Sequence, residues 1–327
     1  MKNMDFVTVG DTVVDDFIRL KDAAVHCKVN HEECELCVRF GDKVPFESST
    51  IVYGVGNAAN AAVSAARLGL SVAHITNIGK DSNGDKIVEY FKTENIDTGY
   101  VTQQPAVPTN YHYVLWYEDE RTILVHQNEY EYTFPHDLPE PKTIYFSSIG
   151  EKALPYRDEL AEYLHQHPNT FFAFQPGVFD IKVGVERLKR LYSRADLYVV
   201  NKEEAQRVLG LPDTADDIPP LLAGLAALGP KNVIITDDKN GAYALQADGT
   251  TFNLPMYKDP NPPIERTGAG DAFCSTVAAY MTMGGVTLKD AMQRGLINAA
   301  YVVQDIGAQR GLLKKEKLES LFNALAQ

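Results

Sequence analysis

The residues best suited to do chemistry lie in one short segment, residues 266–271 with the sequence RTGAGD, directly before an apolar stretch of helical composition. Small residues before a helix let backbone N–H groups approach an anion closely, and the helix N-terminus adds partial positive charge. Asp271 falls in the first turn of that helix, where its carboxylate can accept the proton of an attacking hydroxyl group. The segment predicts an anion-binding loop with a general base, although a glycine-rich turn before an ordinary acidic helix start fits the same letters.

A second cluster of reactive side chains lies in residues 26–37, HCKVNHEECELC. Zinc takes four soft or borderline ligands in tetrahedral geometry, and C-x-x-C is a common half of such a site. The spacing here is tighter than that of the common zinc fingers. Two interpretations therefore stand: a structural zinc ion that stiffens this segment, or reduced thiols beside solvated histidines. The zinc ligands in the first interpretation are Cys27, His31, Cys34 and Cys37.

The elements that must position these residues alternate between short apolar runs and helical patterns. Such alternation predicts an α/β fold with a mostly parallel central sheet covered by helices on both faces. Ligands of such sheets bind at the carboxyl ends of the strands. The predicted strands are 6–9, 72–75, 143–147, 170–174, 196–200 and 232–236, and the predicted helices are 57–69, 83–94, 156–166, 183–192, 202–209, 269–283, 287–304 and 314–326.

Two segments interrupt this rhythm, at about 12–52 and 106–133. The second reads as an antiparallel hairpin that turns at residues 118–120, and the first ends in a β-like run. Paired with each other, they form a small β-sheet lid that can cover an active site. Aromatic residues in these segments can stack on a substrate or pack against a partner; they are Tyr53, Tyr111, Tyr113, Trp116 and Tyr117.

Composition limits the classes of partner. The chain has 327 residues and a formal net charge of −13, so it offers no overall attraction for nucleic acid or for an anionic membrane. We find neither an apolar run of the roughly 20 residues that span a bilayer nor a signal-peptide pattern, and we expect a cytoplasmic location. The length alone suits two domains or one large α/β domain with an insertion, and we expect a single domain, residues 1–327, with an inserted lid. Four cysteines in a chain of this length do not make a disulfide scaffold.

The order of motifs along the chain resembles that of the ribokinase-like (PfkB) carbohydrate kinases. TGAGDAF resembles the C-terminal signature of that family, and residues 55–60, VGNAAN, resemble its Gly-Gly-x-x-x-Asn segment before an alanine-rich helix. Each piece alone is weak, but their shared order over nearly the whole chain is specific. The remaining matches are Gly10 followed by Asp15, residues 78–84 (IGKDSNG), residues 201–204 (NKEE), residues 236–241 and Gly307-Ala308.

The resemblance implies phosphorylation of a hydroxyl group on a sugar-like substrate by ATP with Mg²⁺, and a homodimer formed through the lid. Asp271 is then the general base, and Gly268, Ala269 and Gly270 form the anion hole. Glu204, with Asn201, orders the magnesium ion and its waters. The implied substrate-binding residues are Asp15, Gly56, Asn57 and Asn60, and the implied nucleotide-binding residues are Asn201, Glu204, Thr236, Gly241 and Gly307.

Three residues depart from that pattern. Arg266 stands where the family usually has Asp; it can reach a phosphate or a phosphorylated substrate, or pair with Asp259 or Glu265. The change leaves open whether a monovalent cation binds near this loop. Asp238 stands where the nucleotide loop often has Gly, and Val55 replaces the first glycine of the glycine pair.

Other functions fit parts of the sequence. Residues 54–59 read as G-x-G-x-x-A before a helix, the pattern of a dinucleotide-binding enzyme. Asp81, the acidic residue that would bind the ribose, lies past the next strand, and the segment follows an irregular insertion and not an opening strand, which disfavours this function. No P-loop motif occurs. Within the resembling fold, the alternatives are a nucleoside kinase and a catalytically silent sugar-binding protein.

Overall fold

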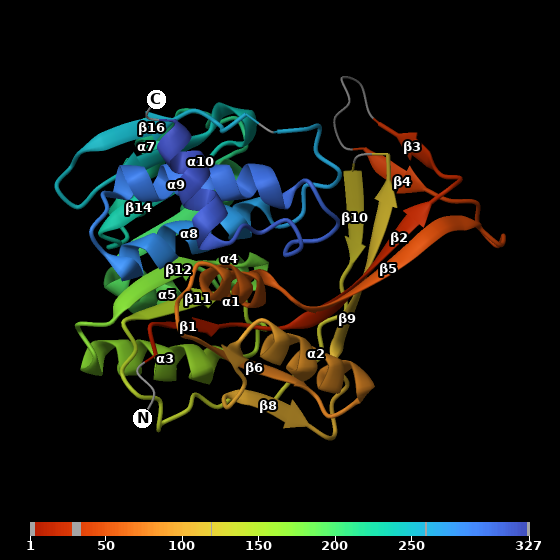
Figure 1. Cartoon of the computed structure of the whole chain (residues 1–327), viewed down its shortest axis with the longest axis horizontal. Helices are drawn as coiled ribbons and strands as arrows, with labels where there is room; N and C mark the ends of the chain where they lie inside the picture. Colours follow the sequence, from red (N-terminus) through yellow and green to blue (C-terminus); the bar gives the residue numbers. More distant parts are fainter. Residues whose placement is uncertain (1–3, 28–33, 119, 259, 326–327) are drawn as a thin grey trace.

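The computed structural model describes residues 4–27, 34–118, 120–258 and 260–325, and its largest element is a ten-stranded sheet (Figure 1). The strand order is β16-β15-β14-β13-β12-β11-β1-β6-β7, with β8 also paired to β6. All pairs from β14 to β7 and β8 are parallel, whereas β15 and β16 pair antiparallel at one edge. The strands are β1 (Phe6–Val9), β6 (Val72–Gly79), β7 (Ile96–Asp97), β8 (Val101–Gln104), β11 (Thr143–Ser147), β12 (Phe171–Gln175), β13 (Leu197–Asn201), β14 (Asn232–Thr236), β15 (Ala242–Leu245) and β16 (Thr251–Leu254).

Helices cover both faces of this sheet, each over its own hydrophobic core. One core is built with α1 (Asn57–Arg67), α2 (Ser82–Thr93), α8 (Ala269–Met283), α9 (Leu288–Val302) and α10 (Lys315–Ala324). The other core is built with α3 (Leu154–Gln166), α5 (Val185–Arg194), α6 (Lys202–Leu209) and α7 (Ile218–Ala226), and the short α4 (Val178–Val183) lies beside α5 and α6. Strand β1 shows the division, because Phe6 belongs to the first core and Val7 and Val9 to the second.

A second, four-stranded sheet forms the lid, and it stands beside the large sheet in Figure 1. Its order is β10-β9-β2-β5, where β2 and β9 are parallel and the outer pairs are antiparallel. The predicted hairpin is therefore present as β9 and β10, and the run expected near residues 49–53 is part of β5. The strands are β2 (Val13–Leu20), β5 (Phe46–Val55), β9 (Asn110–Tyr117) and β10 (Glu120–Leu124).

The lid is tied to the large domain at the start of β9. Asp81, the N-cap of α2, accepts hydrogen bonds from the backbone N–H of Thr109 at 2.8 Å and from its hydroxyl at 2.7 Å. Gly79 packs so closely that an added Cβ would lie 2.3 Å from the backbone nitrogen of Thr109. The segment 78–84 thus connects the end of β6, the start of α2 and the start of the lid.

A buried carboxylate makes a second tie at the base of the lid. Asp11 accepts hydrogen bonds from Gln127 at 2.6 Å, from the Tyr132 hydroxyl at 2.8 Å and from the backbone N–H of Gly150 at 2.7 Å. Burial raises the pKa of Asp11 to about 7, although these donors favour the charged form. The chain that returns from β10 is therefore fastened to the loop that leaves β1.

The cysteine segment forms a small hairpin, with β3 (Ala24–His26) antiparallel to β4 (Glu35–Cys37). Cys27 and Cys34 are joined by a disulfide, and the free cysteines among the described residues are Cys37 and Cys274. A sulfur in a disulfide is not a thiolate ligand, so this structure does not assemble the four zinc ligands expected above. His31 lies outside the described residues.

The disulfide and zinc interpretations predict different thiol counts. In protein purified without reductant and then denatured, we expect alkylation to modify two cysteines before reduction and four after it, with negligible bound zinc. Cys37→Ser is the matched control, because it removes a thiol outside the disulfide and lowers both counts by one. Modification of all four cysteines before reduction, measured by mass spectrometry, would contradict the disulfide.

No described helix is both long and apolar enough to cross a membrane.

Candidate active site

The loop before α8 is shaped by close packing against the C-terminal part of the chain. Gly268 is the N-cap of α8 and has a φ of 83°, in the left-handed region that favours glycine. A Cβ atom on Gly268 would lie 2.3 Å from the Cβ of Ala308. The first N–H groups of a helix lack partners within the helix. The start of α8 at Ala269 and Gly270 therefore offers donors and a positive dipole end to an anion.

Glu265 stabilises the loop before α8 through several hydrogen bonds. Its side chain is 2% exposed and accepts hydrogen bonds from the backbone N–H of Thr267 at 2.6 Å and from the Thr267 hydroxyl. It also accepts a bond from the backbone N–H of Gly307 at 3.3 Å and forms an ion pair with Arg121 of the lid at 3.6 Å. One carboxylate thus joins the anion-binding loop, the loop at Gly307 and the lid.

Asp271 lies in the first turn of α8 between two side-chain amides. Asn60 of α1 donates to one carboxylate oxygen at 2.7 Å, and Gln175 at the end of β12 donates to the other at 3.1 Å. Burial raises the pKa of Asp271, while these two hydrogen bonds and the charge of Arg121 oppose the rise. Asp271 as a whole residue is half-buried, and the burial of its carboxyl group suits a base that must accept a proton.

The orientation of the Asn60 amide is set by its other partner. Gln309 donates from Nε2 to the Asn60 oxygen at 2.9 Å and to the carbonyl of Gly54 at 2.8 Å. The Gln309 oxygen accepts from the Tyr90 hydroxyl at 2.7 Å. Because the Asn60 oxygen is occupied by a donor, its NH₂ group is the end that faces Asp271.

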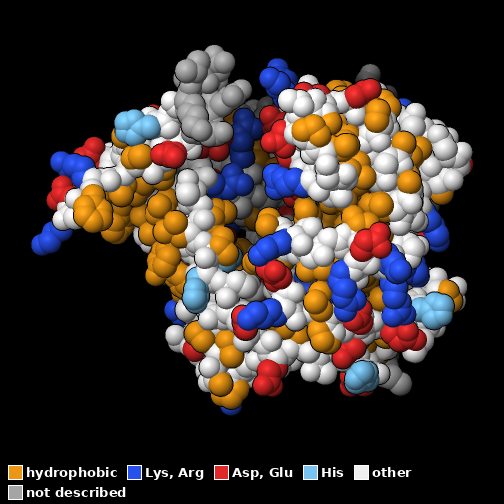
Figure 2. Space-filling model, turned by 180° about the vertical axis from the view of Figure 1, so that it is seen from behind, with side chains coloured by type: hydrophobic (Ala, Val, Ile, Leu, Met, Phe, Trp, Pro, Cys, Tyr) orange, Lys and Arg blue, Asp and Glu red, His pale blue; other side chains and the backbone are white. Residues whose placement is uncertain are grey.

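Asp271 and the loop line a cavity of about 290 Å³ at the carboxyl ends of the strands. Figure 2 shows the molecule hollowed between the lid and the large domain, with Lys and Arg side chains at the edges of the hollow. Two arginines from different elements, Arg121 of β10 and Arg266 of the loop, take part in the lining. The other lining residues are Asn57, Gln175, Val199, Val200, Asn201, Glu204, Thr236, Thr267, Gly268, Ala269, Gly270, Asp271 and Cys274.

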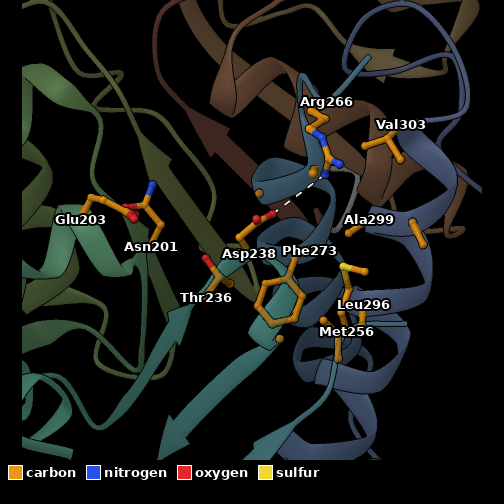
Figure 3. Close-up of a pocket in the computed structure, with 14 residues that line it drawn as sticks. Asn201, Glu203, Thr236, Asp238, Met256, Arg266, Phe273, Leu296, Ala299 and Val303 are labelled. Carbon is orange, nitrogen blue, oxygen red and sulfur yellow. Dashed lines mark ion pairs between the residues drawn. The ribbon is translucent and has the colours of Figure 1, made fainter. Parts of the chain in front are cut away.

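A second cavity of about 320 Å³ adjoins the first and is more apolar (Figure 3). Thr236 and Gly241, predicted to bind a nucleotide, line it from the end of β14 and from the position just before β15. On the opposite side it is bounded by the start of α8 and by α9. The full lining is Asn201, Glu203, Thr236, Asp238, Gly241, Met256, Arg266, Ala269, Gly270, Phe273, Leu296, Ala299, Ala300 and Val303.

Asn201 and Glu204 begin helix α6 as a capping box. The Asn201 oxygen accepts from the backbone N–H of Glu204 at 2.7 Å, and a Glu204 oxygen accepts from the backbone N–H of Asn201 at 2.9 Å. Burial raises the pKa of Glu204, and the nearby charge of Asp271 adds to the rise. Among the described residues no group of three or more His, Cys, Asp or Glu could hold a metal ion.

The predicted substrate residues divide between the floor of the site and the lid. Asn57 and Asn60 lie beside Asp271, and Gly56 precedes them as the N-cap of α1 with a φ of 119°. Asp15 lies on lid strand β2, 3.4 Å from His112 of β9, and is not among the residues that line the two cavities described here.

Two other predicted residues, Gly307 and Arg266, have the following surroundings. Gly307 is not among the residues that line the two cavities; its backbone N–H donates to Glu265, and an added Cβ would lie 3.5 Å from Val52 and 3.6 Å from Phe17 of the lid. Arg266 pairs with Asp238 at 3.9 Å, while Glu265 contacts Arg121 and Thr267 instead. Asp259, the other expected partner, lies outside the described residues.

The sequence did not predict a site role for three residues that belong to the site: Arg121, Gln175 and Glu265. Gln175 ends a buried strand as a polar residue, a signal that fits the rule that ligands bind at strand carboxyl ends. Glu265 was considered only as a partner for Arg266. Arg121 had no local signal, because only the fold of the lid brings it over the loop.

Comparison with known proteins gives consistent matches over almost the whole chain. The model of the pfkB family carbohydrate kinases matches residues 22–315. An ATP-dependent 6-phosphofructokinase of Thermoanaerobacterium thermosaccharolyticum is 23% identical, covering 98% of this chain and 95% of its own. A ribokinase of Staphylococcus aureus is 24% identical, covering 96% and 98%.

Solved structures share the fold. The Arabidopsis thaliana ribokinase complexed with ribose and ATP superposes with a TM-score of 0.79 at 17% identity, covering 98% of this chain and 99% of its own. The Methanocaldococcus jannaschii nucleoside kinase superposes with a TM-score of 0.77 at 18% identity, covering 99% and 100%.

Proposed function

The chain belongs to the pfkB family of carbohydrate kinases, and we propose that it transfers the γ-phosphate of ATP to a hydroxyl group of a sugar or sugar-like molecule with Asp271 as general base. As a member of that family it is a phosphotransferase with an alcohol group as acceptor. The observation that carries the proposal is the Asp271 carboxylate, held by Asn60 and Gln175 beside the N-terminus of α8.

Adjacent groups accept the proton of the acceptor hydroxyl and stabilise the charge of the transferred phosphate. The acceptor hydroxyl gives its proton to Asp271 while its oxygen forms the bond to the γ-phosphorus and the bond to the leaving β-phosphate oxygen breaks. A pKa raised by burial makes Asp271 a better proton acceptor than a fully hydrated aspartate. The N–H groups at Gly268, Ala269 and Gly270 stabilise the charge on the transferred group.

The lid supplies a further positive charge to the same site. Arg121 of β10 lines the cavity with Asp271, its side chain is 29% exposed, and its ion pair with Glu265 is long, at 3.6 Å. A guanidinium in a partly dehydrated cavity binds phosphate oxygens strongly, often through two parallel hydrogen bonds. We therefore place Arg121 on the transferred phosphate or on the acceptor side of it, where closing of the lid also excludes water.

The two cavities suggest the direction of the nucleotide. The apolar wall formed by Met256, Phe273 and Leu296 suits a purine base, and the loop at residues 268–270 suits the terminal phosphate. ATP then lies with its base toward α9 and its γ-phosphate toward Asp271. Thr236 and Gly241 border the base end.

The donor set is compatible with magnesium bound through phosphates and water. Mg²⁺ keeps several waters and commonly takes one or two protein carboxylates beside substrate phosphates. Glu204 lines the catalytic cavity, and one of its oxygens is used in the capping box with Asn201. We propose Glu204 as the residue that orders a hydrated Mg²⁺, whose charge would offset that of the phosphates.

The proposed catalytic role predicts the behaviour of Asp271→Asn. This change keeps the side-chain shape and removes the base, so we expect turnover to fall by about 10²- to 10⁴-fold while MgATP binding is retained. The assay is acceptor-dependent ADP release, screened over sugars, sugar phosphates and nucleosides. The screen also separates a sugar kinase from a nucleoside kinase.

Asp290→Asn is the matched control, because Asp290 caps α9 at its far end and lies outside both cavities. It should leave turnover near the wild-type value. Near-wild-type turnover in Asp271→Asn would remove Asp271 from the mechanism. ATP consumption by the wild type that no acceptor increases would instead favour the silent sugar-binding protein.

We also propose that the chain forms a homodimer through the lid. The lid carries exposed large hydrophobic side chains, and hydrophobic side chains gather over this part of the molecule on the left of Figure 2. A mixed sheet whose outer face is apolar needs a second layer to exclude water. The exposed large hydrophobic residues on its strands are Phe46, Ile51, Tyr113, Ile123 and Leu124. The pairing register places Ile51, Tyr113 and Leu124 in one row on the same face, whereas Ile123 lies in the row of buried Val114.

Sedimentation velocity tests this interface. We expect the wild type to sediment as a dimer at micromolar concentration and Ile51→Lys/Leu124→Lys to sediment as a monomer, because two buried charges per subunit oppose association. Val178→Lys is the control, since Val178 is also exposed but lies on α4, away from the lid. A monomeric wild type would contradict the proposal.

A further inference from the structure

We infer that Arg266 binds the middle of the nucleotide phosphate chain, and that Asp238 holds Arg266 across the mouth of the pocket until a nucleotide displaces it. The inference rests on the proposed function, because it takes the two adjoining cavities to be the site of ATP.

The position of Arg266 follows from the way the two cavities meet. Both are lined by Asn201, Thr236, Arg266, Ala269 and Gly270. A nucleoside triphosphate with its base in the apolar cavity and its terminal phosphate at the loop must pass its inner phosphates along this shared wall. Arg266 is the cationic member of the wall.

Carboxylates outnumber cationic side chains in the lining of the two cavities, which makes the positive charge of Arg266 important for binding phosphate. The described residues that line the two cavities include four carboxylates, Glu203, Glu204, Asp238 and Asp271. Their cationic residues are Arg121 and Arg266, and Arg121 is already beside buried Glu265. A polyphosphate that enters such an acidic surrounding needs a local positive charge, because the chain as a whole has a net charge of −13.

The ion pair between Arg266 and Asp238 is weak enough for a phosphate group to replace Asp238 as the partner of Arg266. The nitrogen and oxygen are 3.9 Å apart, and the two side chains are 50% and 80% exposed. Figure 3 shows the guanidinium of Arg266 extending from the loop toward the carboxylate of Asp238 at the mouth of the pocket. Exposed ion pairs of this kind contribute little, whereas a guanidinium can bind phosphate oxygens through two charge-assisted hydrogen bonds.

Asp238 lines the pocket and has a positive backbone φ angle, which is uncommon for residues other than glycine. Its φ is 39°, in the left-handed region, at the start of the short 3₁₀ turn Asp238–Asn240. The neighbouring Asp237 pairs with Lys202 at 3.3 Å, which fixes the turn to the start of α6. Asparagine also tolerates left-handed backbone, so Asp238→Asn removes the charge without a new demand on the backbone.

The test is calorimetric titration of the full-length protein with MgATP, MgADP and adenosine. Arg266→Gln should raise the Kd for MgATP and MgADP about tenfold or more and leave the Kd for adenosine unchanged, since adenosine carries no phosphate. Asp238→Asn should lower the Kd for MgATP about two- to fivefold by freeing Arg266. In the double variant the gain from Asp238→Asn should shrink, because its partner is absent.

Two results would overturn the inference while the proposed function stands. One is MgATP binding by Arg266→Gln that equals that of the wild type. The other is an equal loss of MgATP and adenosine binding, which indicates a purely structural role for Arg266. Failure of the wild type to bind any adenine nucleotide would overturn the inference together with the ATP part of the proposed function.

Discussion

The Asp271 carboxylate, bound by the amides of Asn60 and Gln175, is the contact on which the geometry of the site depends. It joins α8 to α1 and to the end of β12, three elements far apart in the sequence. Asn60 is in turn oriented by Gln309 from the C-terminal loop. A carboxylate that is buried must be hydrogen-bonded, and these bonds fix its position as well as offset its burial. The alanine-rich α1 allows this approach, because its small side chains let it pack between the sheet and α8.

In the proposed function an acidic chain must bind ATP, which is itself a polyanion. The net charge of −13 opposes phosphate, so attraction must be local. The start of α8 supplies N–H groups and a helix dipole, and Arg121 and Arg266 add charge from two different sides. Both arginines contact carboxylates, Glu265 and Asp238, at 3.6 Å and 3.9 Å. Such long pairs keep the guanidinium groups in place without the strong, short contacts that would compete with a phosphate.

Local patterns were sufficient to predict most of the helices, the central parallel strands and the anion-binding loop. The strand and helix alternation follows from hydrophobic periodicity, and residues 266–271 carry their chemistry in consecutive positions. Asn60 and Thr236 were placed through the resemblance to a family with the same order of motifs. Residues whose role depends on tertiary contacts carried little or no local signal, as Arg121 shows, since it reaches the loop only through the pairing of β10 with β9. The hydrogen bond from the backbone N–H of Gly307 to Glu265 also depends on the fold, and no periodicity in the sequence indicates it. The edge strands β15 and β16 and the pairing of Cys27 with Cys34 were missed for the same reason.

The central proposal is that Asp271 acts as a base whose pKa is set by burial and by the hydrogen bond from Asn60. The direct measurement is the dependence of kcat/KM for the acceptor on pH, in the wild type and in Asn60→Ala. The base must be deprotonated, so activity falls at low pH, and burial places the fall above the ordinary aspartate pKa of 3.8. Loss of the Asn60 hydrogen bond destabilises the carboxylate and should move the fall in activity to higher pH. A variant with lower activity but an unchanged midpoint would contradict the account.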